Sequence, residues 1–127
     1  MSEQHPTNDL SVVHGHQYIS LTTFRKNGKG VITPVWFVQR DGKLCVWTQA
    51  NSGKVKRLRN NARVTLSPCT VRGKVLGPAV EGEVRILSGQ EAEEVGSLFV
   101  EKYGWKMHSF SFLYRKHEHL VLEITVL

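Results

Sequence analysis

The fold is decided by the stretch VITPVWFVQRDGKLCVWT, which runs from Val31 to Thr48. Apolar, β-branched and aromatic residues dominate it on both sides of Asp41-Gly42, a dipeptide typical of two-residue hairpin turns. We therefore expect a strand over 31–40, a tight turn, and a second strand over 43–48. Two strands joined by so short a turn run antiparallel, which argues against units in which a helix connects parallel strands.

Similar strand patterns flank this hairpin on both sides. Residues 18–24 alternate and lead into the turn signal Asn27-Gly28. Further strands are expected over 63–67, where Pro68 is expected to end the strand, and over 80–86 and 120–126. Six antiparallel strands around one small core predict a mainly β fold, a split β-barrel with two or three short helices, because closing a sheet removes its exposed edges.

Two segments change from strand to helix periodicity. Val55 and Leu58 lie three residues apart among basic residues, and they predict a short amphipathic helix with Ser52 as its N-cap. A second helix is predicted to begin with the capping box Ser88-x-x-Glu91 and to end at Gly104.

Composition is that of an ordinary globular domain. The 127 residues are 40% hydrophobic and 22% charged, which excludes disorder, collagen and coiled coil for the whole chain. We expect one domain over 1–127, in which 1–16 form a flexible N-terminal segment. A domain this small that handles a large ligand often borrows part of its binding site from a second copy of itself.

No feature of the sequence indicates export or membrane insertion. No stretch approaches the roughly 18 apolar residues of a membrane-spanning helix, and residues 1–10 lack the apolar core of a signal peptide. Cys45 and Cys69 show no spacing typical of a disulfide framework or a zinc site. We therefore expect a cytoplasmic protein with two buried free thiols and no membrane partner.

The charge distribution points to an anionic ligand. Seventeen Lys and Arg residues outweigh eleven acidic ones, and no acidic residue lies between Asp41 and Glu81. A solvated basic helix face would have the same composition. A helix that begins after Ser52, however, offers free backbone N–H groups, and an anion there would relieve the unfavourable position of Lys54 in the first turn. A phosphate site is therefore predicted at Thr48, Ser52, Gly53 and Lys54.

A second signal lies in the strand around Pro34. Proline removes a hydrogen-bond donor from the strand and implies an edge or a bulge, so that free backbone groups beside Trp36 could form a flat wall for a heteroaromatic ring. An ordinary edge strand with a core tryptophan would give the same pattern. The aromatic run Trp105, Phe110, Phe112 and Tyr114 is equally open between packing and a wall contributed across a dimer interface.

Several common motifs are missing from the sequence. Gly28 and Gly30 lack the third glycine and the following helix of a dinucleotide fingerprint, and there is no Walker A motif or nucleophile elbow. His14-x-His16 has no third ligand at useful spacing, so no metal site is predicted. If the protein is an enzyme, its reactive atom therefore belongs to a cofactor.

The strand and helix segments, taken in order, resemble the pyridoxamine 5′-phosphate oxidase-like split-barrel superfamily. The matching segments are YISLTTF (18–24), TPVWFV (33–38), DG (41–42), VWT (46–48), SGKVKRLRNN (52–61), RVTLSPC (63–69), GP (77–78) and VEG (80–82). Within the superfamily, the sequence is most similar to the small deazaflavin-dependent (coenzyme F420) oxidoreductases. The resemblance covers 18–87 well and the C-terminal third in outline.

The resemblance implies a homodimer with two equivalent sites for F420 or FMN at the subunit interface. In relatives, the cofactor phosphate lies against the positions matching Thr48, Ser52 and Lys54, and the ring lies along the strand matching 33–36. The partner subunit would add walls near Gly77 to Val80 and Trp105 to Phe110. The expected cofactor-binding residues are Thr33, Pro34, Val35, Trp36, Trp47, Thr48, Ser52, Gly53, Lys54, Arg57, Gly77, Pro78 and Trp105.

The implied function is hydride transfer between a flavin-type cofactor and a small unsaturated or oxidised molecule. Surplus basic residues such as Lys56 favour the acidic tail of F420 over FMN. No catalytic side chain is assigned, although Tyr18, His108 and Tyr114 could donate a proton. The alternative is a non-catalytic protein that stores FMN or a flavin-like ligand. A nucleic-acid partner ranks last, because the aromatic residues are not interleaved with the basic run.

Overall fold

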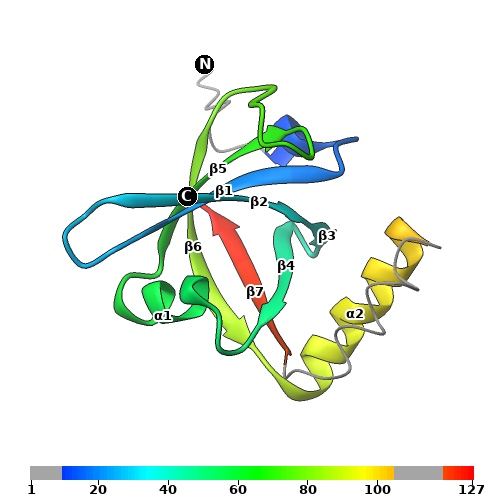
Figure 1. Ribbon diagram of the computed structural model, residues 1–127. Coiled ribbons are helices and arrows are strands. Elements are labelled where there is room, and N and C mark those ends of the chain that lie inside the picture. Colours follow the sequence, from blue (N-terminus) through cyan, green and yellow to red (C-terminus); the bar gives the residue numbers. More distant parts are fainter. Residues whose placement is uncertain (1–9, 105–118) are drawn as a thin grey trace.

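The computed structural model describes residues 10–104 and 119–127. Within these ranges the chain forms seven strands, two α-helices and a short 3₁₀ helix (Figure 1). The 3₁₀ helix is Leu10–Val13, and the other elements in chain order are β1 (Tyr18–Phe24), β2 (Gly30–Trp36), β3 (Val38–Arg40), β4 (Lys43–Gln49), α1 (Gly53–Asn60), β5 (Arg63–Cys69), β6 (Val80–Leu87), α2 (Gly89–Tyr103) and β7 (His119–Val126).

All seven strands belong to one antiparallel sheet, in the order β2-β1-β5-β6-β7-β4-β3. The two edge strands, β2 and β3, follow each other in the chain and are separated by Phe37 alone. The sheet therefore curls into a half-barrel whose two edges meet at Phe37 and diverge between β2 and β4 (Figure 1). The mainly β, antiparallel fold expected from the sequence is confirmed.

The expected count of six strands is wrong, and the difference lies at Phe37. The strand predicted over 31–40 is interrupted there, because the Phe37 N–H and C=O bond to the Tyr103 hydroxyl instead of to a neighbouring strand. A second correction concerns Pro68, which lies inside β5 and pairs with Ile19. Pairing between β5 and β6 stops at Leu66, so the missing N–H of Pro68 interrupts no ladder on that side.

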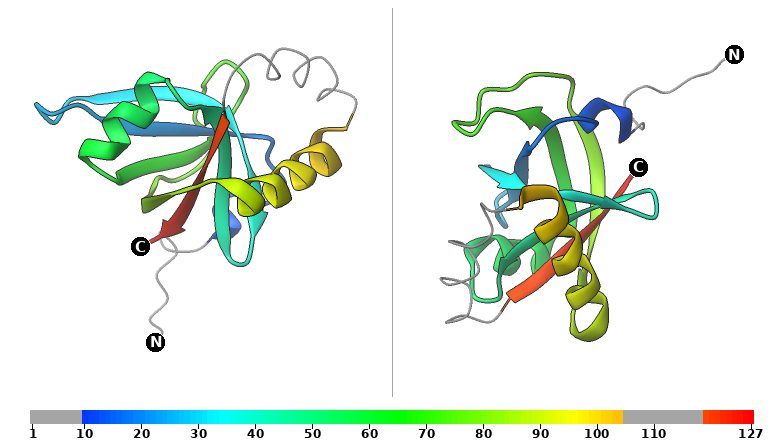
Figure 2. Two further views of the ribbon diagram at one scale, coloured as in Figure 1. Left: turned by 90° about the horizontal axis from the view of Figure 1, so that it is seen from below. Right: turned by 90° about the vertical axis from the view of Figure 1, so that its right-hand side faces the viewer.

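The core has two parts, on the two faces of the sheet. Inside the half-barrel, alternate residues such as Leu44 and Val46 pack with Val13 of the 3₁₀ helix, which has no exposed surface. On the outer face, Cys45 packs against the apolar side of α2. Figure 2 shows α2 crossing beside the half-barrel, with α1 near the β1–β2 hairpin. Residues that alternate along β4 therefore face two different clusters.

The start of α1 matches the sequence prediction, and the start of α2 does not. The Val55 N–H donates to Ser52 Oγ at 3.3 Å, so Ser52 is the N-cap of α1. The Ser88 side chain makes no capping hydrogen bond. Gly89, the first residue of α2, has a positive φ of 64°, and the Glu91 carboxylate lies 3.6 Å from Arg85.

Other local predictions agree with the structure. Asp41 and Gly42 have φ of 53° and 75°, as a tight hairpin turn requires, and Gly104 ends α2 with φ of 58°. Cys45 and Cys69 are both free and buried. None of the helices in the described part of the chain is long and apolar enough to cross a membrane.

Candidate functional site

A cavity of about 450 Å³ lies where β2 and β4 diverge. Its walls come from these two strands, from the start of β1, from the start of α1, from α2 and from the loop between β5 and β6. The lining residues are Tyr18, Pro34, Val35, Trp36, Trp47, Thr48, Gln49, Ser52, Lys54, Val71 and Phe99. Among them Lys54 alone carries a formal charge, so the described lining is apolar except at the α1 end.

The α1 end of the cavity carries two hydroxyl groups, of Thr48 and Ser52, and the ammonium group of Lys54. Thr48 Oγ1 and Ser52 Oγ lie 3.4 Å apart, because Thr48 is near the end of β4 and Ser52 caps the following helix. The Lys54 ammonium reaches across to β2 and donates to Thr33 Oγ1 at 3.3 Å. This end of the cavity therefore offers hydrogen-bond donors of the kind that phosphate groups accept from.

A second cation, Arg57, lies beside the first. Its Nε donates to Thr23 Oγ1 at 2.6 Å, and its guanidinium lies over the first turn of α1. A Cβ on Gly53 would be 2.9 Å from an Arg57 terminal nitrogen, so the glycine leaves room for that side chain.

Lys54 and Arg57 lack an acidic partner in the described part of the chain. Burial lowers the pKa of Lys54 from its usual 10.5, and the neighbouring charge of Arg57 lowers it further. None of the described carboxylates forms an ion pair with either cation. An anionic ligand would therefore supply the charge that this part of the structure does not.

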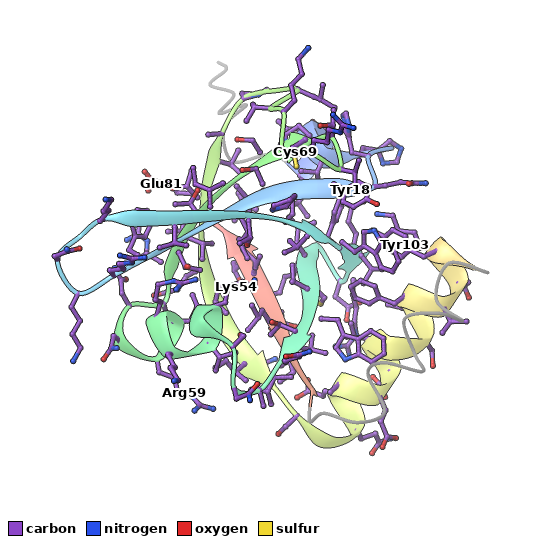
Figure 3. The ribbon with its side chains drawn as sticks, in the orientation of Figure 1. Tyr18, Lys54, Arg59, Cys69, Glu81 and Tyr103 are labelled. Carbon is purple, nitrogen blue, oxygen red and sulfur yellow. The ribbon has the colours of Figure 1, made fainter. Side chains whose placement is uncertain are left out.

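The opposite end of the cavity is aromatic. Trp47 lies 5.8 Å from Phe99, measured between ring centroids, and Tyr103 stacks on Trp36 at 4.3 Å with 11° between the ring planes. Tyr18 continues the series at 6.5 Å from Trp36. In Figure 3, Lys54 and Tyr103 lie on either side of β4. The arrangement can hold a molecule that has an anionic group at one end and a planar ring at the other.

The structure gathers most of the residues that the sequence singled out. Seven of the expected residues line the cavity, namely Pro34, Val35, Trp36, Trp47, Thr48, Ser52 and Lys54. Thr33, Gly53 and Arg57 adjoin it through the contacts described above. Gly77 and Pro78 do not line it, although Val71 of the same loop does. Trp105 and the aromatic run after it lie outside the described residues.

Four lining residues were absent from the expected binding set, namely Tyr18, Gln49, Val71 and Phe99. A signal for Tyr18 was available, because a hairpin centred on Asn27 pairs Tyr18 with Trp36, as observed. Phe99 had no such signal, since its place on the apolar face of α2 is equally typical of a core residue. No group of three potential metal ligands occurs within the described ranges.

A family model described as pyridoxamine 5′-phosphate oxidase matches residues 9–127. The chain belongs to the pyridoxamine 5′-phosphate oxidase family. This assignment agrees with the curled antiparallel sheet. A comparison with curated protein sequences found no match.

Solved structures with the same fold have diverse descriptions. HutZ, a heme storage protein from Vibrio cholerae, is 12% identical with a TM-score of 0.71, over 92% of this chain and 86% of that one. Rv2991, a conserved hypothetical protein from Mycobacterium tuberculosis, is 23% identical with a TM-score of 0.70, over 99% and 81%. An F420 reductase is 16% identical with a TM-score of 0.66, over 100% and 96%. These similarities show the fold.

Proposed function

We propose that this member of the pyridoxamine 5′-phosphate oxidase family is an oxidoreductase that holds a flavin-type cofactor, F420 or FMN, in the cavity between β2 and β4. One observation carries the proposal: the same cavity has an ammonium group among hydroxyls at one end and aromatic rings at the other. A flavin-type cofactor has the matching shape, since an anionic tail extends from a planar heteroaromatic ring.

The chain's own residues would bind and orient this cofactor. Lys54 and the hydroxyls of Thr48 and Ser52 would hold the phosphate, and Trp36 would lie against the ring. Because β2 pairs with β1 on one side only, its other edge has backbone groups that can bond to ring heteroatoms. The bound ring would supply the hydride chemistry, with a small unsaturated or oxidised molecule as substrate. The apolar walls would exclude water from the reacting face.

A second copy of the chain is proposed to complete the site. Val71 lines the cavity with 60% of its surface exposed, and Val75 and Leu76 of the same loop are 55% and 50% exposed. Exposed apolar side chains grouped on one loop are typical of a surface that another protein covers. A homodimer that covers this loop would shield both the loop and the open side of the cavity.

The charges around α1 support F420 over FMN. Lys56 and Arg59 are exposed on the helix that carries Lys54, and Figure 3 shows Arg59 projecting from α1. The acidic tail of F420 would meet such cations after leaving the cavity, whereas FMN has no comparable tail. Because salt screens the attraction between exposed charges, the Kd values for F420 and FMN decide this preference.

The second candidate function is storage of a flavin-like ligand without catalysis. The described lining of the cavity contains no carboxylate and no histidine, the groups that most often transfer protons in enzymes. One structural neighbour, HutZ, is described as a heme storage protein. A storage protein would need the same anionic and aromatic contacts but no proton donor.

An absorbance titration tests the proposal. The purified full chain is titrated with FMN and, separately, with F420, and the shift of the cofactor band gives the Kd and the stoichiometry. Binding of one cofactor per subunit followed by turnover of a panel of enones and quinones supports the oxidoreductase. Binding without turnover supports storage. A chain that binds neither cofactor contradicts both candidates.

A further inference from the structure

We propose that Tyr103 is the residue that positions Trp36, so that the last turn of α2 sets the plane of the wall against which the bound ring lies. The inference rests on the proposed function for its ligand and on the contacts below for its geometry. Trp36 lines the cavity, whereas Tyr103 does not. Tyr103 would therefore act on a ligand through Trp36.

Stacking fixes the back of the Trp36 ring. The Tyr103 ring lies 4.3 Å from it, almost parallel, and Tyr103 is only 4% exposed. Phe99, one turn earlier on α2, stacks on Tyr103 at 5.7 Å with 18° between the planes. Because these rings are nearly parallel and closely packed, Trp36 cannot tilt toward α2 without displacing Tyr103.

The Tyr103 hydroxyl fixes the backbone next to Trp36. It accepts a hydrogen bond from the Phe37 N–H at 2.9 Å and lies 2.8 Å from the carbonyl oxygens of Phe37 and Gln17, which share its single proton. Phe37 is buried at the break between β2 and β3, where strand pairing does not satisfy its polar groups. One phenol therefore takes the place of a neighbouring strand at this residue.

The neighbouring lysine reinforces this contact. The Lys102 ammonium donates to the Phe37 carbonyl at 2.8 Å and lies 3.7 Å from the centroid of the Phe37 ring. Burial raises the pKa of Tyr103 well above its usual value, so its hydroxyl stays protonated and able to donate. A buried tyrosine hydroxyl usually finds a single hydrogen-bond partner, whereas the Tyr103 hydroxyl bonds to both backbone groups of Phe37, the residue that follows Trp36.

Three variants separate this role from general packing. Tyr103→Phe keeps the stacked ring and removes the hydroxyl, and Tyr103→Leu removes both. Val95→Ala is the matched control, because Val95 is on α2 in the same buried cluster but lies two helical turns from Tyr103. Tyr103→Phe keeps the test decisive if the leucine variant does not fold.

The first readout needs no cofactor. The full chain is labelled with 5-fluorotryptophan, and the ¹⁹F resonance of Trp36, one of three tryptophans, is assigned with Trp36→Phe. The second readout is the Kd for FMN or F420. We expect Tyr103→Phe to shift or broaden the Trp36 resonance and to raise the Kd roughly three- to tenfold, the range for a lost hydrogen bond. Tyr103→Leu should do more, and Val95→Ala should lower Tm but change neither readout.

The opposite results would overturn the inference. A Trp36 resonance and a Kd that stay at wild-type values in both Tyr103 variants would show that Tyr103 is a packing residue. If the wild-type chain binds neither cofactor, the proposed function fails. The resonance then still decides the geometry, because an unchanged Trp36 signal in Tyr103→Phe rejects the positioning role and a changed signal retains it.

Discussion

The Lys54 ammonium lies 3.3 Å from the Thr33 hydroxyl and so joins the first turn of α1 to the edge strand β2. A hydroxyl orients an ammonium group without neutralising it. Lys54 therefore keeps its charge for a ligand while its side chain is held at the cavity. Five measurements test this view of the site and of the fold.

Replacing Lys54 by alanine should weaken FMN binding strongly. The variant loses a charge-assisted hydrogen bond, so the Kd should rise roughly 10- to 150-fold, as measured by absorbance titration. Lys26→Ala is the control, because Lys26 is exposed in the β1–β2 turn and should leave the Kd nearly unchanged. Equal FMN affinity in the wild-type chain and in the Lys54 variant would contradict the proposed phosphate site.

FMN affinity should fall at alkaline pH earlier than an ordinary lysine would predict. Burial lowers the pKa of Lys54 from 10.5, and the protonated form attracts the phosphate. As pH rises through this lowered pKa, the charge is lost and the Kd increases. Lys54→Arg keeps its charge at these pH values and should flatten the profile. A profile identical in the two proteins would argue against Lys54 as the titrating group.

Ser52 should contribute to stability, and Ser88 should not. Ser52→Ala removes the N-cap of α1 and should lower the free energy of unfolding by about 1 kcal/mol in urea. Ser88→Ala should change it little, because the Ser88 side chain makes no capping bond. Ser52→Asp should keep the cap but lose FMN affinity, since it adds a negative charge at the phosphate end of the cavity.

Both thiols should resist modification in the folded protein. Burial raises the pKa of Cys45 to about 11 and also raises the pKa of Cys69, so little thiolate forms at neutral pH. A colorimetric disulfide reagent should react slowly with the native chain and promptly with both cysteines in urea. Cys45→Ser should halve the denatured signal. Rapid labelling of the native protein would mean that at least one of the two thiols is accessible to the reagent in the folded chain.

Two glycines should respond oppositely to alanine. In Gly82→Ala the new Cβ would lie 2.6 Å from the Ile124 side chain and 3.2 Å from the Thr125 carbonyl, so overpacking should cost about 1–3 kcal/mol of stability. Gly96, inside α2, has open space around its Cβ position, and alanine there should stabilise by roughly 0.5–1 kcal/mol. The melting temperatures of the two variants should therefore move in opposite directions.

Sequence reasoning succeeded where the determining residues are neighbours in the chain. The alternation in 18–24, the Asp41-Gly42 turn and the Ser52 cap are local, and the structure matches them. The cavity residues between Pro34 and Lys54 are likewise close in the chain, and they come from β2, β4 and the start of α1.

The predictions from the sequence were wrong where the local structure depends on a residue far away in the chain. The break at Phe37 depends on a hydrogen bond to Tyr103, which lies 66 positions further along the chain. The strand propensity of the residues around Phe37 gives no information about that hydrogen bond. The capping-box pattern at Ser88 is also present in the sequence, but Ser88 makes no capping bond, Gly89 has a positive φ and Glu91 lies beside Arg85. Phe99 joins the cavity only because α2 packs against the outer face of β4.

The single residue between β2 and β3 also limits how such a chain can vary in length. Side chains alternate between the two faces of a strand. An insertion or deletion at Phe37 would therefore move the side chains of either the strand that ends at Trp36 or the strand that begins at Val38 to the opposite face of the sheet. Changes in length are tolerable in the turn around Asn27, whereas the point where the two edges meet must keep its spacing.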